Sequence, residues 1–164
     1  MRLETLLETE SVRVCCWRSL FVQSWVAAPL PHHQDQVGEA FEVMIERYAD
    51  EGFITLSILS MKGLPASPPA EVREKSRRQF ARTDPYVNLS AFVFELSGFG
   101  SRSVKTFMKA LLLLTRPKAE TRTFDALGEG VDWLVNHDRC ETALAAEQAE
   151  FCAALDAWRL ARDR

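Results

Sequence analysis

The sequence has few cysteines, no long apolar run and no large excess of charge of either sign. Four cysteines in 164 residues do not make the disulfide framework of a small secreted domain. The longest uninterrupted apolar run, 110–114, is far shorter than the roughly 20 residues that span a bilayer. A net charge of −3 gives no general attraction to nucleic acid or to membranes. We therefore expect a cytoplasmic protein with reduced cysteines, no integral membrane segment and no nucleic-acid partner.

Complete cofactor and catalytic motifs are also missing. The segment 98–103 reads Gly-Phe-Gly-Ser-Arg-Ser, which lacks the Lys-Ser/Thr pair of a P-loop and has Ser103 where the dinucleotide fingerprint needs glycine. No G-x-S-x-G elbow is present. His137 and Cys140 could form a thiolate–imidazole pair, but no third group that would orient them is evident. We expect no cofactor and no enzymatic activity.

Two segments could still bind an anion. Backbone amides of the turn 98–103 would face a ligand at a helix N-terminus, although a tight turn with a capping serine explains the same residues. The helix expected at 71–82 has five basic residues and two glutamates, so it could meet an acidic partner or be a solvated face. The candidate anion turn is Gly98, Gly100, Ser101 and Arg102, and the candidate anionic-partner face is Arg73, Arg77 and Arg78.

The residues from His32 to Asp35 contain two imidazoles and a carboxylate. Metal ligands on a helix converge when they lie four residues apart. Adjacent histidines after Pro31 do not have that spacing. We interpret them as an exposed helix start and expect no metal site.

Hydrophobic periodicity predicts an α/β fold. Residues 12–17 and 20–26 alternate with period two and predict a hairpin, on which Cys15 and Cys16 point to opposite faces. We expect its two tryptophans to cover the core, although they could also form an exposed interface. Strands that alternate with helices then imply a mainly parallel sheet of four or five strands, with the hairpin as an antiparallel edge. Further strands are expected at 53–60, 86–97 and 120–124, and helices at 37–48, 71–82, 104–114 and 125–135.

The C-terminal segment differs in composition from the rest. We expect an α/β domain over 1–138 and a C-terminal helix over 139–164, which is rich in alanine and has neither glycine nor proline. Its large apolar residues form a narrow, heptad-like seam. That seam could pack on the chain's own sheet, or it could be a homodimer contact or a docking surface for a partner protein. The seam consists of Leu144, Phe151, Leu155 and Trp158.

The order of elements resembles that of bacterial STAS-like proteins. Members of this group often end the sheet region with a phenylalanine strand and a helix that carries an alanine and a Trp-Leu pair, matched here by Phe124, Ala126, Trp133 and Leu134. Trp17 and Trp25 on the opening hairpin also fit. The resemblance covers roughly residues 8 to 136.

The resemblance implies a regulatory role. STAS domains include anti-sigma-factor antagonists, which dock onto a kinase or regulator and carry a phosphorylatable serine in a turn after a central strand. The matching segment here is 60–64, where Lys62 stands in place of that serine. The resemblance thus implies a non-enzymatic regulatory or scaffolding domain that acts through protein contacts in bacterial signalling or cell organisation. The alternative is a module that binds a small ligand or a lipid headgroup through the turn 98–103 or the helix 71–82.

Overall fold

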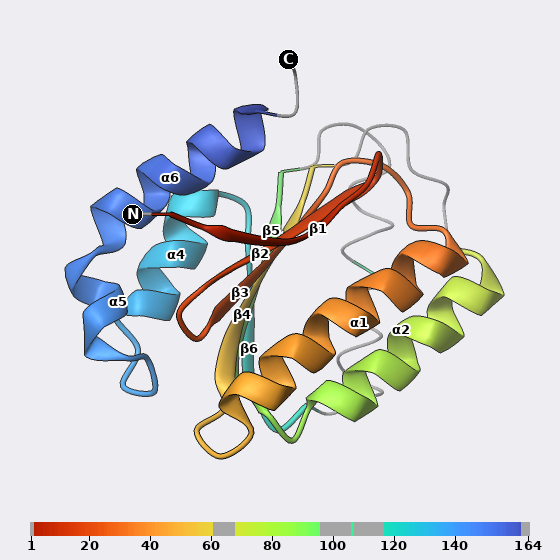
Figure 1. Ribbon diagram of the computed structural model, residues 1–164, viewed down its shortest axis with the longest axis horizontal. Coiled ribbons are helices and arrows are strands. Elements are labelled where there is room, and N and C mark those ends of the chain that lie inside the picture. The colour runs from red at the N-terminus through yellow and green to blue at the C-terminus, as the bar shows by residue number, and fades with distance from the viewer. Residues whose placement is uncertain (1, 61–67, 96–105, 107–116, 162–164) are drawn as a thin grey trace.

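One six-stranded sheet forms the centre of the molecule, and helices cover both of its faces (Figure 1). The computed structural model describes residues 2–60, 68–95, 106 and 117–161. The strands are β1 (Glu4–Glu8), β2 (Val12–Trp17), β3 (Leu20–Trp25), β4 (Phe53–Leu59), β5 (Val87–Phe94) and β6 (Glu120–Phe124). The helices are α1 (Pro31–Tyr48), α2 (Ala70–Thr83), α4 (Leu127–Val135), α5 (Thr142–Ala146) and α6 (Gln148–Leu160).

The strands lie in the sheet in the order in which they occur along the chain. β1, β2 and β3 are antiparallel, and β3 through β6 are parallel. The predicted hairpin, β2 and β3, is confirmed, but the sheet is mixed and β1, not the hairpin, forms its antiparallel edge. The sheet has one strand more than predicted, because Glu4–Glu8 pairs with β2. The register shifts between Thr5 and Leu7, and this bulge breaks the alternation by which a strand is found in a sequence.

α1 and α2 lie on the same face of the sheet. α1 connects β3 to its neighbour β4, and α2 connects β4 to its neighbour β5, so both connections move in the same direction along the sheet. Because connections between parallel strands are nearly always right-handed, both helices lie on the same face. Phe21 stacks on Phe41 of α1, with ring centroids 4.0 Å apart. Phe80 of α2 packs at the margin of the same core, where its ring centroid is 6.1 Å from that of Phe92.

The opposite face is covered by α4, α5 and α6, which lie together on the other side of the strands (Figure 1). Gly130 lets α4 approach β5 closely, because a Cβ atom there would lie 2.8 Å from Cγ2 of Val93. Trp17 of β2 stacks on Phe151 of α6, with centroids 5.0 Å apart. Apolar side chains of β2 to β5 and of these three helices form one buried cluster.

The C-terminal seam is part of this core. Leu144, Phe151 and Leu155 are 0% exposed within the chain itself, so the seam packs in cis and these three residues are not available to a partner. The predicted single helix is in fact α5 and α6, which meet at Glu147. The segment after residue 138 therefore shares the hydrophobic core of the strands and is not an appended helix. Trp158 is only partly buried.

Some predicted features lie outside the described residues. These are the turn 98–103 with its candidate anion ligands, nearly all of the apolar helix expected at 104–114, and the segment 61–67. In the part of the chain that the structure does describe, no helix is both long and apolar enough to cross a membrane.

Leu155 and Leu160 make a matched pair of leucines in the same helix. Leu155 is 0% exposed and Leu160 is 65% exposed. We expect Leu155→Ala to lower the free energy of unfolding by about 2–5 kcal/mol, because it removes buried methyl groups and leaves a cavity. Leu160→Ala should change it by less than about 0.5 kcal/mol. Urea denaturation of both variants checks this, and equal effects would contradict the packing of α6 on the sheet.

Candidate functional site at the carboxyl edge of the sheet

The carboxyl edge of the sheet is the edge at which β3, β4 and β5 end. β1 also ends there and β2 begins there, because Glu8 pairs with Arg13 and Val12 pairs with Trp25. α1 starts from this edge, a few residues after β3. In open α/β sheets, ligands bind outside the carboxyl ends of the parallel strands. The polar groups at this edge are therefore the first candidates for a functional site.

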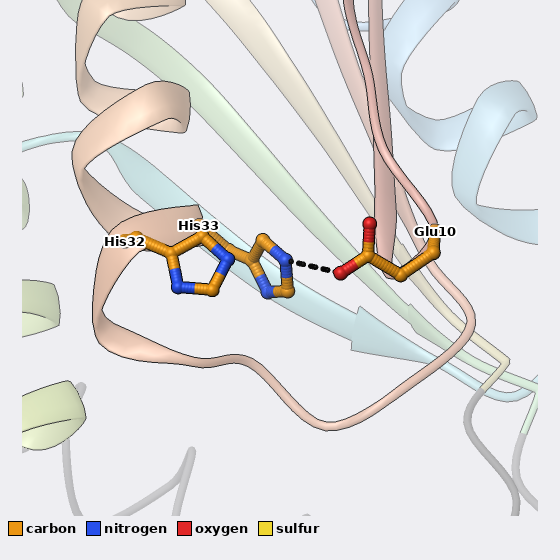
Figure 2. Close-up of side chains that lie close together, drawn as sticks. All are labelled: Glu10, His32 and His33. Carbon is orange, nitrogen blue, oxygen red and sulfur yellow. Dashed lines mark hydrogen bonds and ion pairs between the residues drawn. The ribbon is translucent and has the colours of Figure 1, made fainter.

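His33 is a buried capping residue at the start of α1. It is 1% exposed, and its Nδ1 accepts a hydrogen bond from the backbone N–H of Leu30 at 3.3 Å. Its Nε2 lies 3.1 Å from Oε1 of Glu10, in the turn between β1 and β2, as Figure 2 shows. Since Nδ1 accepts a hydrogen bond, we assign the proton of the neutral ring to Nε2, which donates it to Glu10. The expectation of an exposed helix start is correct for His32 and wrong for His33.

Glu10, His32 and His33 also have the composition of a metal site. Their potential ligand atoms all lie within 4.8 Å of one another. A metal at Nε2 of His33 would need the lone pair of the nitrogen that carries the proton. Moving that proton to Nδ1 would set it against the N–H of Leu30, whereas metal-bound histidines normally donate their second ring N–H to an acceptor. The contacts of His33 therefore favour a cap over a metal ligand.

Arg13 is a buried cation at the start of β2. The residue is 6% exposed, and its guanidinium carbon lies 4.4 Å from the centre of the Trp158 ring. Nη1 donates a hydrogen bond to the backbone carbonyl of Trp158. Nε forms an ion pair with Oε1 of Glu8 at 3.3 Å, but it makes no hydrogen bond with any residue that the structure describes. Arg13 thus ties α6 to the sheet while part of its donor capacity stays unused.

Ser60, Glu95 and Arg159 form a second polar group at the same edge. The hydroxyl of Ser60, just after β4, donates to Oε2 of Glu95 at 2.7 Å. Arg159 near the end of α6 donates to both carboxylate oxygens of Glu95 and, at 3.2 Å, to Ser60. Burial by itself raises the pKa of Glu95, but the hydrogen bonds from Arg159 and Ser60 outweigh it and lower the pKa below its usual value. This network is a second tie between α6 and the sheet.

A cavity of about 400 Å³ opens between these groups. Its volume falls within the range of small-ligand pockets. Arginine and serine side chains line it on the sheet side, and the last residues of α6 close it on the other. The lining residues are Arg13, Ser24, Val26, Ser60, Asp156, Trp158, Arg159 and Leu160.

The basic helix α2 carries less free charge than its five cations suggest. Arg77 and Arg78 both pair with Glu74, and Arg73 donates to the carbonyl of Pro68. Lys75 and Arg82 pair with Asp35 and Glu42 on α1. Exposed ion pairs are weak, but this face holds almost as many carboxylates as cations. Its role as a docking surface for an anionic partner stays a prediction.

The structure does not bring His137 and Cys140 together as a reactive pair. Nε2 of His137 lies 3.0 Å from Oε2 of Glu120, and Nδ1 accepts from the N–H of Arg139. Cys140 donates its S–H to the carbonyl of Glu141. Two causes raise the pKa of the Cys140 thiol: its burial, which is the larger, and the negative charge of Glu141. Cys15 and Cys16 point to opposite faces as predicted. Burial also raises the pKa of Cys16, to about 11.

Of the residues at the carboxyl edge, the sequence singled out Trp158 as part of the C-terminal seam, but not Arg13, Glu95 or Arg159. Arg13 stands between apolar residues on a strand face shared with Cys15 and Trp17, and a charged residue in such a row is a usable signal. Ser60 lies in the segment 60–64 singled out by the resemblance. Glu95 and Arg159 are 64 residues apart, and no local pattern joins them.

Comparison of the chain with protein-family models, with curated proteins and with solved structures gave no match.

The two adjacent histidines offer a test of the cap. We expect His33→Ala to lower the free energy of unfolding by about 2 kcal/mol, because the backbone N–H of Leu30 loses its acceptor and Glu10 loses its donor. His32→Ala, at an exposed position, should change it by less than about 0.5 kcal/mol. Urea denaturation in EDTA and in zinc decides between cap and metal. Stabilisation by zinc that both variants abolish would contradict the capping role.

Glu95 predicts a dependence of stability on pH. Because its pKa is lowered in the folded state, the ionised carboxylate adds stability above its unfolded pKa, and that stability is lost as the pH falls through the folded value. The wild type should therefore lose more free energy of unfolding between about pH 7 and pH 3 than Glu95→Gln does. Arg159→Gln should likewise reduce the loss of free energy of unfolding over this pH range. The double variant should lose about as much as either single variant. If both single variants lost as much free energy of unfolding between about pH 7 and pH 3 as the wild type does, the ion pair would be contradicted.

Proposed function

We propose that this chain is a non-enzymatic regulatory domain that binds a protein partner at the carboxyl edge of its sheet. The observation that carries the proposal is the position of exposed apolar side chains. Among the residues that the structure describes, three large hydrophobic side chains are the most exposed: Val26 at 36%, Leu30 at 47% and Leu160 at 65%. Val26 and Leu160 line the cavity at the carboxyl edge, and Leu30 belongs to the same connector as Val26.

The charges around this apolar patch favour a partner with basic residues. The side chain of Glu8 is 56% exposed and that of Glu10 is 77% exposed, and Asp156 on α6 is also exposed. A hydrogen bond from its own backbone amide and one from His33 lower the pKa of Glu10, so Glu10 is ionised at neutral pH. An apolar centre with an acidic rim fits a partner surface that presents an apolar side chain among lysines or arginines.

The resemblance to STAS-like regulators supports the same class of function. It rests on the order of elements and on residues such as Phe124 and Trp133, and it suggests a role in bacterial signalling or cell organisation. A resemblance of fold is a weaker argument for function than a surface, so the exposed patch is the main support.

The cavity favours a second candidate function, the binding of a small ligand. A volume of about 400 Å³ with two arginines and two serines in its lining suits a small polar molecule. This candidate uses the carboxyl edge, not the turn 98–103 or the helix 71–82 considered from the sequence.

Two substitutions in the patch test the protein contact. We expect Val26→Glu and Leu160→Glu to abolish capture of a partner by the tagged full chain in its own cells, because each buries a carboxylate in an apolar contact. Lys118→Glu places the same residue at an exposed position before β6, at the opposite edge, and should retain the partner. The captured partner is then purified, and its binding to each of the three variants is measured. In a second series, the basic residues of the partner are substituted one at a time and binding to the wild-type chain is measured.

Three outcomes would contradict this proposal. The first is equal binding by all three variants. The second is a partner whose basic residues make no difference. The third is a second copy of the chain as the occupant, which sedimentation of the purified protein would show as self-association lost in Val26→Glu and Leu160→Glu.

A further inference from the structure

We propose that the cavity at the carboxyl edge binds a small organic carboxylate, with its anionic group on Arg13 and its apolar part against Val26, Trp158 and Leu160. This inference deepens the second candidate function above, the binding of a small ligand, and it shares Val26 and Leu160 with the proposed protein contact.

The incomplete pairing of Arg13 is the first reason. A buried cation is costly unless it is paired and hydrogen-bonded. A guanidinium has five N–H donors, and within the described part of the chain only Nη1 of Arg13 makes a hydrogen bond, to Trp158. Nε is buried and makes no hydrogen bond with the described residues, and its ion pair with Glu8 is to a side chain that is 56% exposed. A ligand carboxylate in the cavity would accept from Nη2, which has no hydrogen-bond partner among the described residues and, unlike Nε, is not fully enclosed.

The second reason is the chemistry of the rest of the lining. Ser24 is 4% exposed and belongs to the cavity, and its hydroxyl forms no hydrogen bond with the described residues, so it can donate to the same anion. Arg159 is already bound to Glu95 and Ser60, whereas Arg13 is paired only with the exposed carboxylate of Glu8, so Arg13 is the better cation for a ligand. The indole of Trp158 and the side chains of Val26 and Leu160 then offer apolar surface at the mouth.

The same geometry predicts an unusual effect of Glu8. Its carboxylate competes with the ligand for Arg13, since its Oε1 lies 3.3 Å from Nε. Removing the charge of Glu8 should therefore strengthen binding, whereas removing that of Arg13 should weaken it. Opposite effects from two neighbouring substitutions are not expected for a ligand that only adheres to the apolar mouth.

Isothermal titration of the full chain at neutral pH with hexanoate, hexanol and acetate tests the site. Hexanoate should bind, and hexanol and acetate should each bind at least about tenfold more weakly, because each lacks one half of the recognised chemistry. Arg13→Met keeps the stem beside Trp158 and should weaken hexanoate binding about tenfold or more. Glu8→Gln should strengthen it severalfold, and Arg77→Gln, on the distant helix α2, should leave it unchanged.

The thermal melting of each variant separates loss of binding from loss of fold. If Arg13→Met does not fold, Ser24→Ala and Glu8→Gln still decide, because the first should weaken hexanoate binding and the second should strengthen it. Absence of hexanoate binding, equal binding of hexanol, or an identical affinity in Glu8→Gln and the wild type would overturn the proposal. Capture of a protein partner is measured separately with Val26→Glu and Leu160→Glu, so failure of hexanoate binding and failure of the protein contact can be told apart.

Discussion

The packing of α6 on the second face of the sheet is the contact on which the rest of the structure depends. Because α1 and α2 both lie on one face, the other face of β2 to β5 needs a cover from elsewhere in the chain. Leu144, Phe151 and Leu155 help α4 to provide it, and all three are fully buried. A parallel sheet is stable in water only when both faces are covered, so the C-terminal segment belongs to the fold itself.

This packing also builds the carboxyl edge. The last turn of α6 lines the same cavity as Val26 and Ser60, which directly follow β3 and β4. There Trp158 meets Arg13 and Arg159 meets Glu95, and the cavity lies between the helix end and the strand ends. A core contact and a candidate binding site are therefore linked through one helix. A partner or ligand that binds at this edge would act on the end of the helix that closes the sheet.

Much of the fold could be predicted from the sequence because periodicity reports which faces are buried. The hairpin, the later parallel strands and α2 follow from such patterns. β1 escaped prediction because a bulge interrupts its alternation. The seam of Leu144, Phe151 and Leu155 was visible, but no local pattern says which surface it meets. The site was hidden for a similar reason. The environment of Arg13 comes from Trp158, 145 residues away, and the burial of His33 comes from the turn that contains Glu10.

Native-state hydrogen exchange tests the central claim, that α6 is part of the core and not a separable helix. Amides of buried core elements open only with global unfolding, whereas an independent helix opens at a lower free energy. We expect the amides of Phe151 and Leu155 in α6 to exchange with the same free energy of opening as the amide of Ile58 in β4, and this value should equal the free energy of global unfolding. Exchange of α6 at a clearly lower free energy, while Ile58 stays protected, would contradict it.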